Sequence, residues 1–77
     1  MSEVPLDDPT ALLRLANARM PFGKYAGFLL IDLPETYLIW FARKGYPQGE
    51  LGRQLASMYS IKENGIEDLL RPLVRQG

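Results

Sequence analysis

The stretch MPFGKYAG, from Met20 to Gly27, decides the fold class of this 77-residue chain. It places a proline, two glycines, a lysine and a tyrosine between sequences with helical patterns. Glycine allows positive φ values, and proline fits only the start or the edge of a strand. Residues 20–31 therefore predict a short, irregular β-hairpin, with the glycine-flanked residues 23–27 as its tip.

Helical patterns flank this hairpin on both sides. Apolar spacing predicts helices over residues 9 to about 18, 34–44 and 50–63, and a short fourth helix over residues 66–73 that Pro72 kinks or ends. Because an isolated hairpin is weak, helices must cover one of its faces. We predict a small, mostly helical α+β domain over residues 7–77, in which the hairpin packs on three to four helices after a flexible tail at residues 1–6. The alternative is an all-α bundle with residues 20–31 as an ordered loop.

The composition excludes several classes of protein. The chain has no cysteine and no histidine, so disulfides, Cys/His zinc sites, thiol nucleophiles and histidine-based catalysis are ruled out. Its net charge of zero removes the argument from a strongly basic chain for nucleic-acid binding, although a local basic patch is still compatible with it. The sequence begins without the pattern of a signal peptide and has no run long enough to span a bilayer. We expect a cytoplasmic protein without membrane contact, bound metal or cofactor.

The tip allows two interpretations. In the functional one, Gly23 and Gly27 free backbone N–H groups that hold an anion together with Lys24, while Tyr25 stacks on a base or ring. In the structural one, the tip is a turn with a solvated lysine and a core tyrosine, because glycines in turns need no ligand. The tip is not a Walker loop, since it lacks the GK[ST] ending.

The body of the helix predicted over residues 34–44, Tyr37 to Phe41, is apolar nearly all round. Such a helix lies at the centre of a core or keeps one face for a partner. Leu38 and Trp40 point in nearly opposite directions on an ideal helix, so both are buried only if the helix is enclosed on several sides. If one of them is exposed, Trp40 is the better candidate for an interaction, because its indole N–H tolerates water.

Basic residues gather in the middle of the chain. Arg43 and Lys44 end the second helix, where they also complement its dipole. If the hairpin packs beside this helix end, one positive patch forms from Arg19, Lys24, Arg43, Lys44 and Arg53. Such a patch is typical of contacts with a phosphate backbone, and the alternative is a solvated surface of mixed charge.

The carboxylates predict no catalytic site. Asp32 comes just before a helix, and Glu63, Glu67 and Asp68 surround the start of another, where acids are stabilised by the helix dipole. A chain this thin has little room for a desolvated pocket. We therefore expect a protein that is not an enzyme.

The sequence also resembles a known family. The motifs are MPFGKYxG at residues 20–27, IDLPxxYLxWFARKG at residues 31–45, GxLGxxL at residues 49–55 and NGIxxLLxPL at residues 64–73. Together they resemble short bacterial proteins labelled as a domain of unknown function or as putative quorum-sensing-regulated virulence factors. Relatives often carry a further lysine at the position of Ala26, so the tip here has one positive charge fewer.

A shorter part of this pattern is similar to an accessory segment of some DnaQ-like exonucleases. The catalytic acidic motifs of those enzymes are absent, so the resemblance implies only an accessory role that faces nucleic acid. We predict a binding module that contacts nucleic acid or a nucleic-acid-processing protein. The residues expected to form its surface are Gly23, Lys24, Tyr25, Gly27, Trp40, Arg43 and Lys44. The alternative is a protein–protein adaptor or a homodimer that uses the aromatic helix over residues 34–44.

Overall fold

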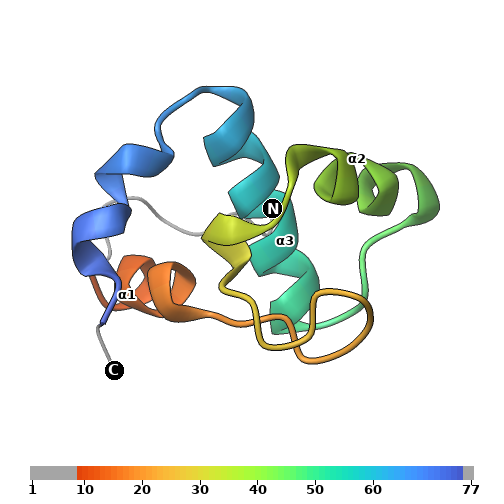
Figure 1. Ribbon diagram of the computed structural model, residues 1–77, viewed down its shortest axis with the longest axis horizontal. Coiled ribbons are helices and arrows are strands. Elements are labelled where there is room, and N and C mark those ends of the chain that lie inside the picture. The colour runs from red at the N-terminus through yellow and green to blue at the C-terminus, as the bar shows by residue number, and fades with distance from the viewer. Residues whose placement is uncertain (1–8, 76–77) are drawn as a thin grey trace.

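Helices form in this chain where the apolar spacing and the end signals agree. The computed structural model describes residues 9–75, so the predicted tail at residues 1–6 lies outside the described residues. The three α-helices are α1 (Pro9–Asn17), α2 (Glu35–Lys44) and α3 (Glu50–Glu63), as Figure 1 shows. Three single-turn 3-10 helices are η1 (Leu30–Asp32), η2 (Glu67–Leu69) and η3 (Arg71–Leu73). The prediction of helices over residues 34–44 and 50–63 is confirmed to within one residue.

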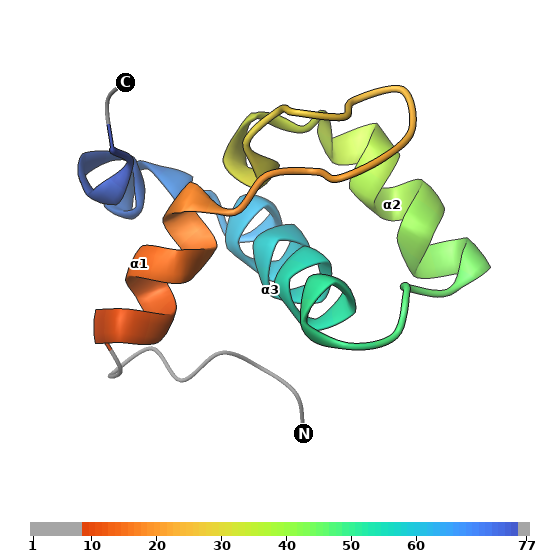
Figure 2. The ribbon, with the colours of Figure 1, turned by 90° about the horizontal axis from the view of Figure 1, so that it is seen from below.

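Helix α3 lies at the centre of the molecule. It contacts α2 and the turns η1 and η2, while α1 packs against η1 and η3. Figure 2 shows α3 between α1 and α2. Every other element therefore packs, directly or through a short turn, around one central helix.

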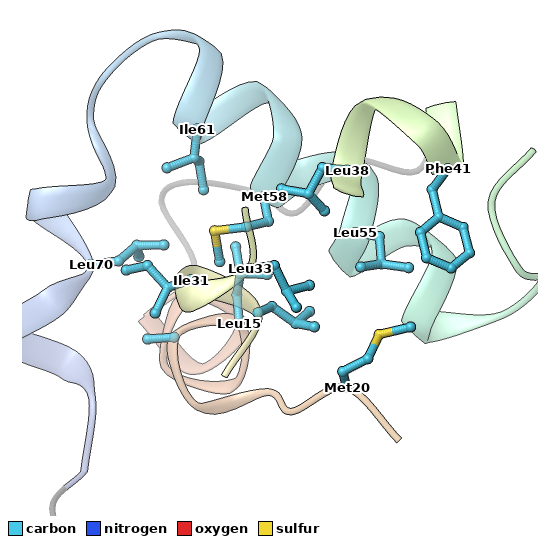
Figure 3. Packing of buried hydrophobic residues seen from close by; sticks show 12 residues of the cluster. Leu15, Met20, Ile31, Leu33, Leu38, Phe41, Leu55, Met58, Ile61 and Leu70 are labelled. Carbon is cyan, nitrogen blue, oxygen red and sulfur yellow. The ribbon is translucent and has the colours of Figure 1, made fainter. Parts of the chain in front are cut away.

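The core combines side chains from the three α-helices, from η1 and from the connecting segments. Leu15 of α1, Leu38 of α2 and Leu55 of α3 have no exposed surface. Met20 and Leu33 of the connecting segments belong to the same buried cluster, and Figure 3 shows these side chains converging. Burying a side chain of this size contributes about 1.5–3 kcal/mol, so this cluster supplies much of the driving force for folding.

The α+β prediction is wrong, and the all-α alternative fits the structure. Residues 20–31 form no strand, and within residues 9–75 the pairing is limited to an isolated antiparallel bridge between Arg19 and Leu29. Pro21 has no N–H to donate, and the N–H groups of Ala26 and Phe28 donate to the carbonyls of Gly23 and Tyr25 within the loop. The chain then enters η1 at Leu30, so no ladder of strand hydrogen bonds can extend.

The predicted fourth helix is also different from the observed structure. Residues 66–73 form η2 and η3 in place of an α-helix, because Pro72 lacks the N–H that a continuous helix needs. Asn17 holds this segment to α1: its Nδ2 donates to the carbonyl of Leu73 at 2.9 Å, and its Oδ1 accepts from the N–H of Arg75 at 2.7 Å.

No helix in the described residues combines the length and the apolar character that a membrane crossing requires.

Candidate functional site

The site begins with a tight loop over residues 20–28, called the tip loop here. The N–H of Met20 donates to the carbonyl of Phe28 at 2.8 Å and closes the loop at its base. Arg19 Nη1 donates to the carbonyl of Gly27 at 2.7 Å and supports the loop from outside. Gly23 and Gly27 have φ values of 80° and 89°, which side chains other than glycine rarely adopt. Figure 2 shows the loop arching beside the first turns of α2.

A chain of aromatic contacts joins the tip loop to α2. Tyr25 contacts Phe28 at 5.4 Å and Tyr37 at 4.7 Å between ring centroids, in both cases edge to face. Tyr37 and Trp40 are within 5° of parallel, with centroids 6.3 Å apart, and Phe41 packs edge-on against both. Pairs of this geometry add about 0.5–1.5 kcal/mol each beyond their buried area. The tip loop and α2 therefore form one packed unit.

This unit carries a shallow, open groove of about 380 Å³, called the aromatic groove here. Its walls are Lys24, Tyr25, Thr36, Tyr37 and Trp40. Half of the Trp40 side chain is exposed, whereas Leu38 on the opposite side of α2 is fully buried. Lys24 Nζ lies over the Tyr25 ring, 5.5 Å from its centroid, so a cation sits on the aromatic surface. The groove can therefore offer ring faces and a positive charge to the same ligand.

The structure brings three of the predicted site residues into this groove, namely Lys24, Tyr25 and Trp40. Gly23 and Gly27 do not line it but shape the loop that holds it. A Cβ atom on Gly23 would lie 3.3 Å from Tyr37 Oη, so this glycine also lets the loop approach α2 closely.

Arg43 and Lys44 lie outside the groove, exposed at the C-terminal end of α2. They follow Trp40 by three and four residues, which places them on the same side of the helix about 5 Å further along its axis. Neither forms an ion pair with another described residue. They place two positive charges next to the exposed Trp40 side chain on the same side of α2.

The larger positive patch expected from the sequence does not form as one site. Arg53 lines a separate hollow with Tyr46 and Pro47, and Arg19 is engaged by the Gly27 carbonyl. This leaves Lys24 at one end of the aromatic groove and the pair Arg43 and Lys44 beyond its other end.

The tip also offers fewer backbone donors than an anion cradle needs. The N–H groups of Ala26, Gly27 and Phe28 donate to the carbonyls of Gly23, Met20 and Tyr25, respectively, at 2.7–3.1 Å. Anion-binding nests depend on successive N–H groups that point outward. In this loop, the side chains of the groove are the stronger candidates for ligand contact.

Sequence reasoning missed four residues of this surface. Thr36 and Tyr37 precede Trp40 by four and three residues, so the helical spacing alone places them beside it. Phe22 and Phe28, which border the tip, have about half of their surface exposed. Their exposure has no comparable signal in the sequence, because only the loop geometry turns them away from the core.

Two further hollows lie away from the groove. One, of about 190 Å³, is lined entirely by apolar side chains, namely Leu12, Ile61, Ile66, Leu69, Leu70 and Leu73. The other, of about 330 Å³, lies where the turn at Tyr46 and Pro47 crosses α3. Burial raises the pKa of the Tyr46 hydroxyl, and the neighbouring Tyr59 raises that pKa further, so Tyr46 stays neutral at ordinary pH.

The carboxylates of the described chain are dispersed. Asp32 pairs with Arg71 at 2.9 Å, and Glu50 lies 3.8 Å from Arg14. No group of three or more acidic side chains converges as a metal site within residues 9–75. The aromatic groove, which combines aromatic rings with a lysine, is therefore a better candidate for a functional site than these dispersed carboxylates.

Comparisons with known proteins confirm the family resemblance. The sequence model of a family described as "putative quorum-sensing-regulated virulence factor" matches residues 8–73. The chain is 52% identical to "Uncharacterized protein YpeB" of Escherichia coli strain K12 over 65 residues, which cover 83% of this chain and 90% of that protein. The protein of the same name from Escherichia coli O157:H7 gives the same values. No solved structure matches the chain significantly.

Proposed function

From its aromatic groove we propose that this chain, which belongs to the family of putative quorum-sensing-regulated virulence factors, is a non-enzymatic module. We propose that this module binds nucleic acid. The family description names no chemistry, so the proposal rests on the site. The observation that carries it is a half-exposed Trp40 in the same groove as Lys24 and two tyrosines.

Aromatic faces and cations are the two components of sequence-tolerant nucleic-acid sites. Bases stack on exposed rings, and each stacked base contributes about 1–3 kcal/mol to binding. Lysine and arginine neutralise the phosphates on either side. In this protein Trp40 supplies the ring, while Lys24 and the pair Arg43 and Lys44 supply the charges at the two ends of the same surface.

The distribution of charge supports a small contact area between the protein and a nucleic acid. The chain as a whole is neutral, so long-range attraction to a polyanion is weak. Binding must then come from local contacts at the groove. We assign no catalytic role to the groove, because its walls carry one lysine and two tyrosines but no carboxylate.

The test is a titration of the full chain with a mixed-sequence DNA strand and with the matching duplex, followed by amide and indole N–H chemical shifts. We expect shifts at Lys24, Tyr25 and Trp40, and an affinity that falls steeply as salt is raised. Lys24→Gln should weaken binding several-fold, whereas Lys62→Gln on the distant end of α3 is the matched control. If neither DNA binds at low salt, the proposal is wrong.

A second candidate function is a protein adaptor or homodimer built on α2. The observation in its favour is that Phe22 and Phe28 of the tip loop and Trp40 of α2 each expose about half of their surface. Exposed aromatic side chains are enriched at protein interfaces. Sedimentation of the chain across a range of concentrations tests it: a dimer that Trp40→Ala dissociates without unfolding favours this candidate, and a monomer throughout removes the homodimer.

A further inference from the structure

We infer that the aromatic groove selects single-stranded nucleic acid, with one unpaired base on the exposed face of Trp40 and phosphates at Lys24 and at the Arg43–Lys44 end. This inference rests on the proposed function and specifies its substrate. It follows from the orientation of the rings, the size of the hollow and the positions of the cations.

The rings set the orientation of a bound base. Tyr37 and Trp40 are parallel to within 5°, Phe41 makes edge-to-face contacts with both, and Tyr25 makes one with Tyr37. A planar base that stacks on Trp40 is therefore also parallel to Tyr37. In a duplex, base faces are covered by their neighbours and only edges and backbone are accessible. A ring platform of this kind can engage a base only when the base is unstacked.

The size of the groove sets the length of strand. At about 380 Å³, it lies at the lower end of the roughly 300–1,000 Å³ typical of small-ligand sites. The groove is open, so a strand can enter and leave along α2 without a closed cavity. Thr36 and Tyr37 add hydroxyl groups along the same wall that can donate to or accept from a base edge. The site therefore holds a few nucleotides, fewer than a full single-strand-binding domain.

The cations set the salt dependence. Lys24, Arg43 and Lys44 have no ion pair with any other described residue, whereas Arg19 is engaged by the Gly27 carbonyl and Arg71 by Asp32. For single strands, the logarithm of the binding constant falls with the logarithm of salt with a slope of about −0.7 per neutralised phosphate. Three cations therefore predict a slope of about −2.

Trp40 allows a direct test because it is the single tryptophan in the chain. Its fluorescence is followed during titration with a thymidine tetranucleotide, with an abasic tetranucleotide of the same backbone, and with a short duplex. Labelled versions of the three probes report total binding by fluorescence anisotropy. We expect the thymidine strand to quench Trp40 and to bind about ten-fold more tightly than either of the other probes.

Variants separate stacking from charge. Trp40→Leu should reduce the affinity for the thymidine strand to that for the abasic strand, with circular dichroism confirming the fold. Lys24→Gln should lower the salt slope by about 0.7, and Lys62→Gln should leave it unchanged. Equal affinity for duplex and single strand, or binding without quenching, overturns the single-strand assignment while the proposed function stands. Binding of none of the probes overturns both.

Discussion

At the scale of single residues, Gly52 shows how closely the backbone packs around α3. A Cβ atom at this position would lie 1.7 Å from the carbonyl oxygen of Pro47, far inside any allowed contact. The turn that connects α2 to α3 therefore crosses α3 where the helix has no side chain. A glycine inside a helix normally costs stability, and here it permits the crossing.

We predict that Gly52→Ala destabilises the protein. The added methyl group forces the turn at Pro47 to move, and overpacking of this kind costs about 1–3 kcal/mol or more. Urea denaturation measures the free energy of unfolding. Ser60→Ala is the matched control, because Ser60 is exposed on the same helix and its replacement should change stability by less than about 0.5 kcal/mol. Equal stability of the two variants would show that the turn is free to shift.

At the scale of elements, α2 divides its apolar residues between two roles. Leu38 and Phe41 face the core, whereas Trp40 lies at the surface and completes the aromatic groove. The middle of α2, residues 37–41, is apolar nearly all round because one face packs on α3 and the neighbouring face packs on the tip loop. The half-exposed Trp40 side chain is therefore accessible to a ligand.

This division predicts different costs for two substitutions on one helix. Leu38→Ala removes a fully buried side chain and should cost about 2–5 kcal/mol in the free energy of unfolding. Trp40→Ala removes a half-exposed ring and should cost clearly less, although it loses the contacts with Tyr37 and Phe41. Chemical denaturation of both variants compares them. A Trp40→Ala variant as unstable as Leu38→Ala would mean that Trp40 serves the core.

At the scale of the whole molecule, the Asn17 side chain links the first helix to the C-terminal turns. Asn17 ends α1 and hydrogen-bonds to both Leu73 and Arg75, which holds η3 against α1. The ion pair between Asp32 and Arg71 links the same segment to η1 but is about half exposed. The Asn17–Leu73 hydrogen bond is partly buried, whereas the Asn17–Arg75 bond is exposed. A partly buried hydrogen bond contributes more to stability than an exposed ion pair, which contributes about 0–1 kcal/mol.

We therefore predict that Asn17→Ala loosens the C-terminal turns more than Asp32→Asn does. The loss of both contacts should cost about 1–3 kcal/mol. Hydrogen exchange reports it directly, because the amides of Leu73 and Val74 are protected by bonds to Leu70 and Arg71 within the turns. Faster exchange at these amides in Asn17→Ala alone is the expected result. Faster exchange in Asp32→Asn alone would show that the ion pair, and not Asn17, holds the C-terminal turns in place.

Much of this architecture follows from the sequence. The glycine at position 45 and the Asn64-Gly65 pair end α2 and α3 where local backbone preferences predict, with Gly45 at a φ of 106°. The apolar spacing of Leu55 and Met58 identifies the buried face of α3. These features depend on contacts within a few residues, so they can be inferred without the tertiary fold.

Other features depend on contacts between distant segments. Residues 20–31 have the turn residues of a hairpin, but the Ala26 and Phe28 N–H groups bond within the loop and Leu30 starts a 3-10 turn. The segment is therefore a loop in an all-α fold. The exposure of Trp40 and its position beside Lys24 depend on how that loop packs on α2. Helices α1, α2 and α3 could be placed from the sequence alone, because helix formation is governed by local spacing and end residues. Only the packing of distant segments decided which aromatic face was left open.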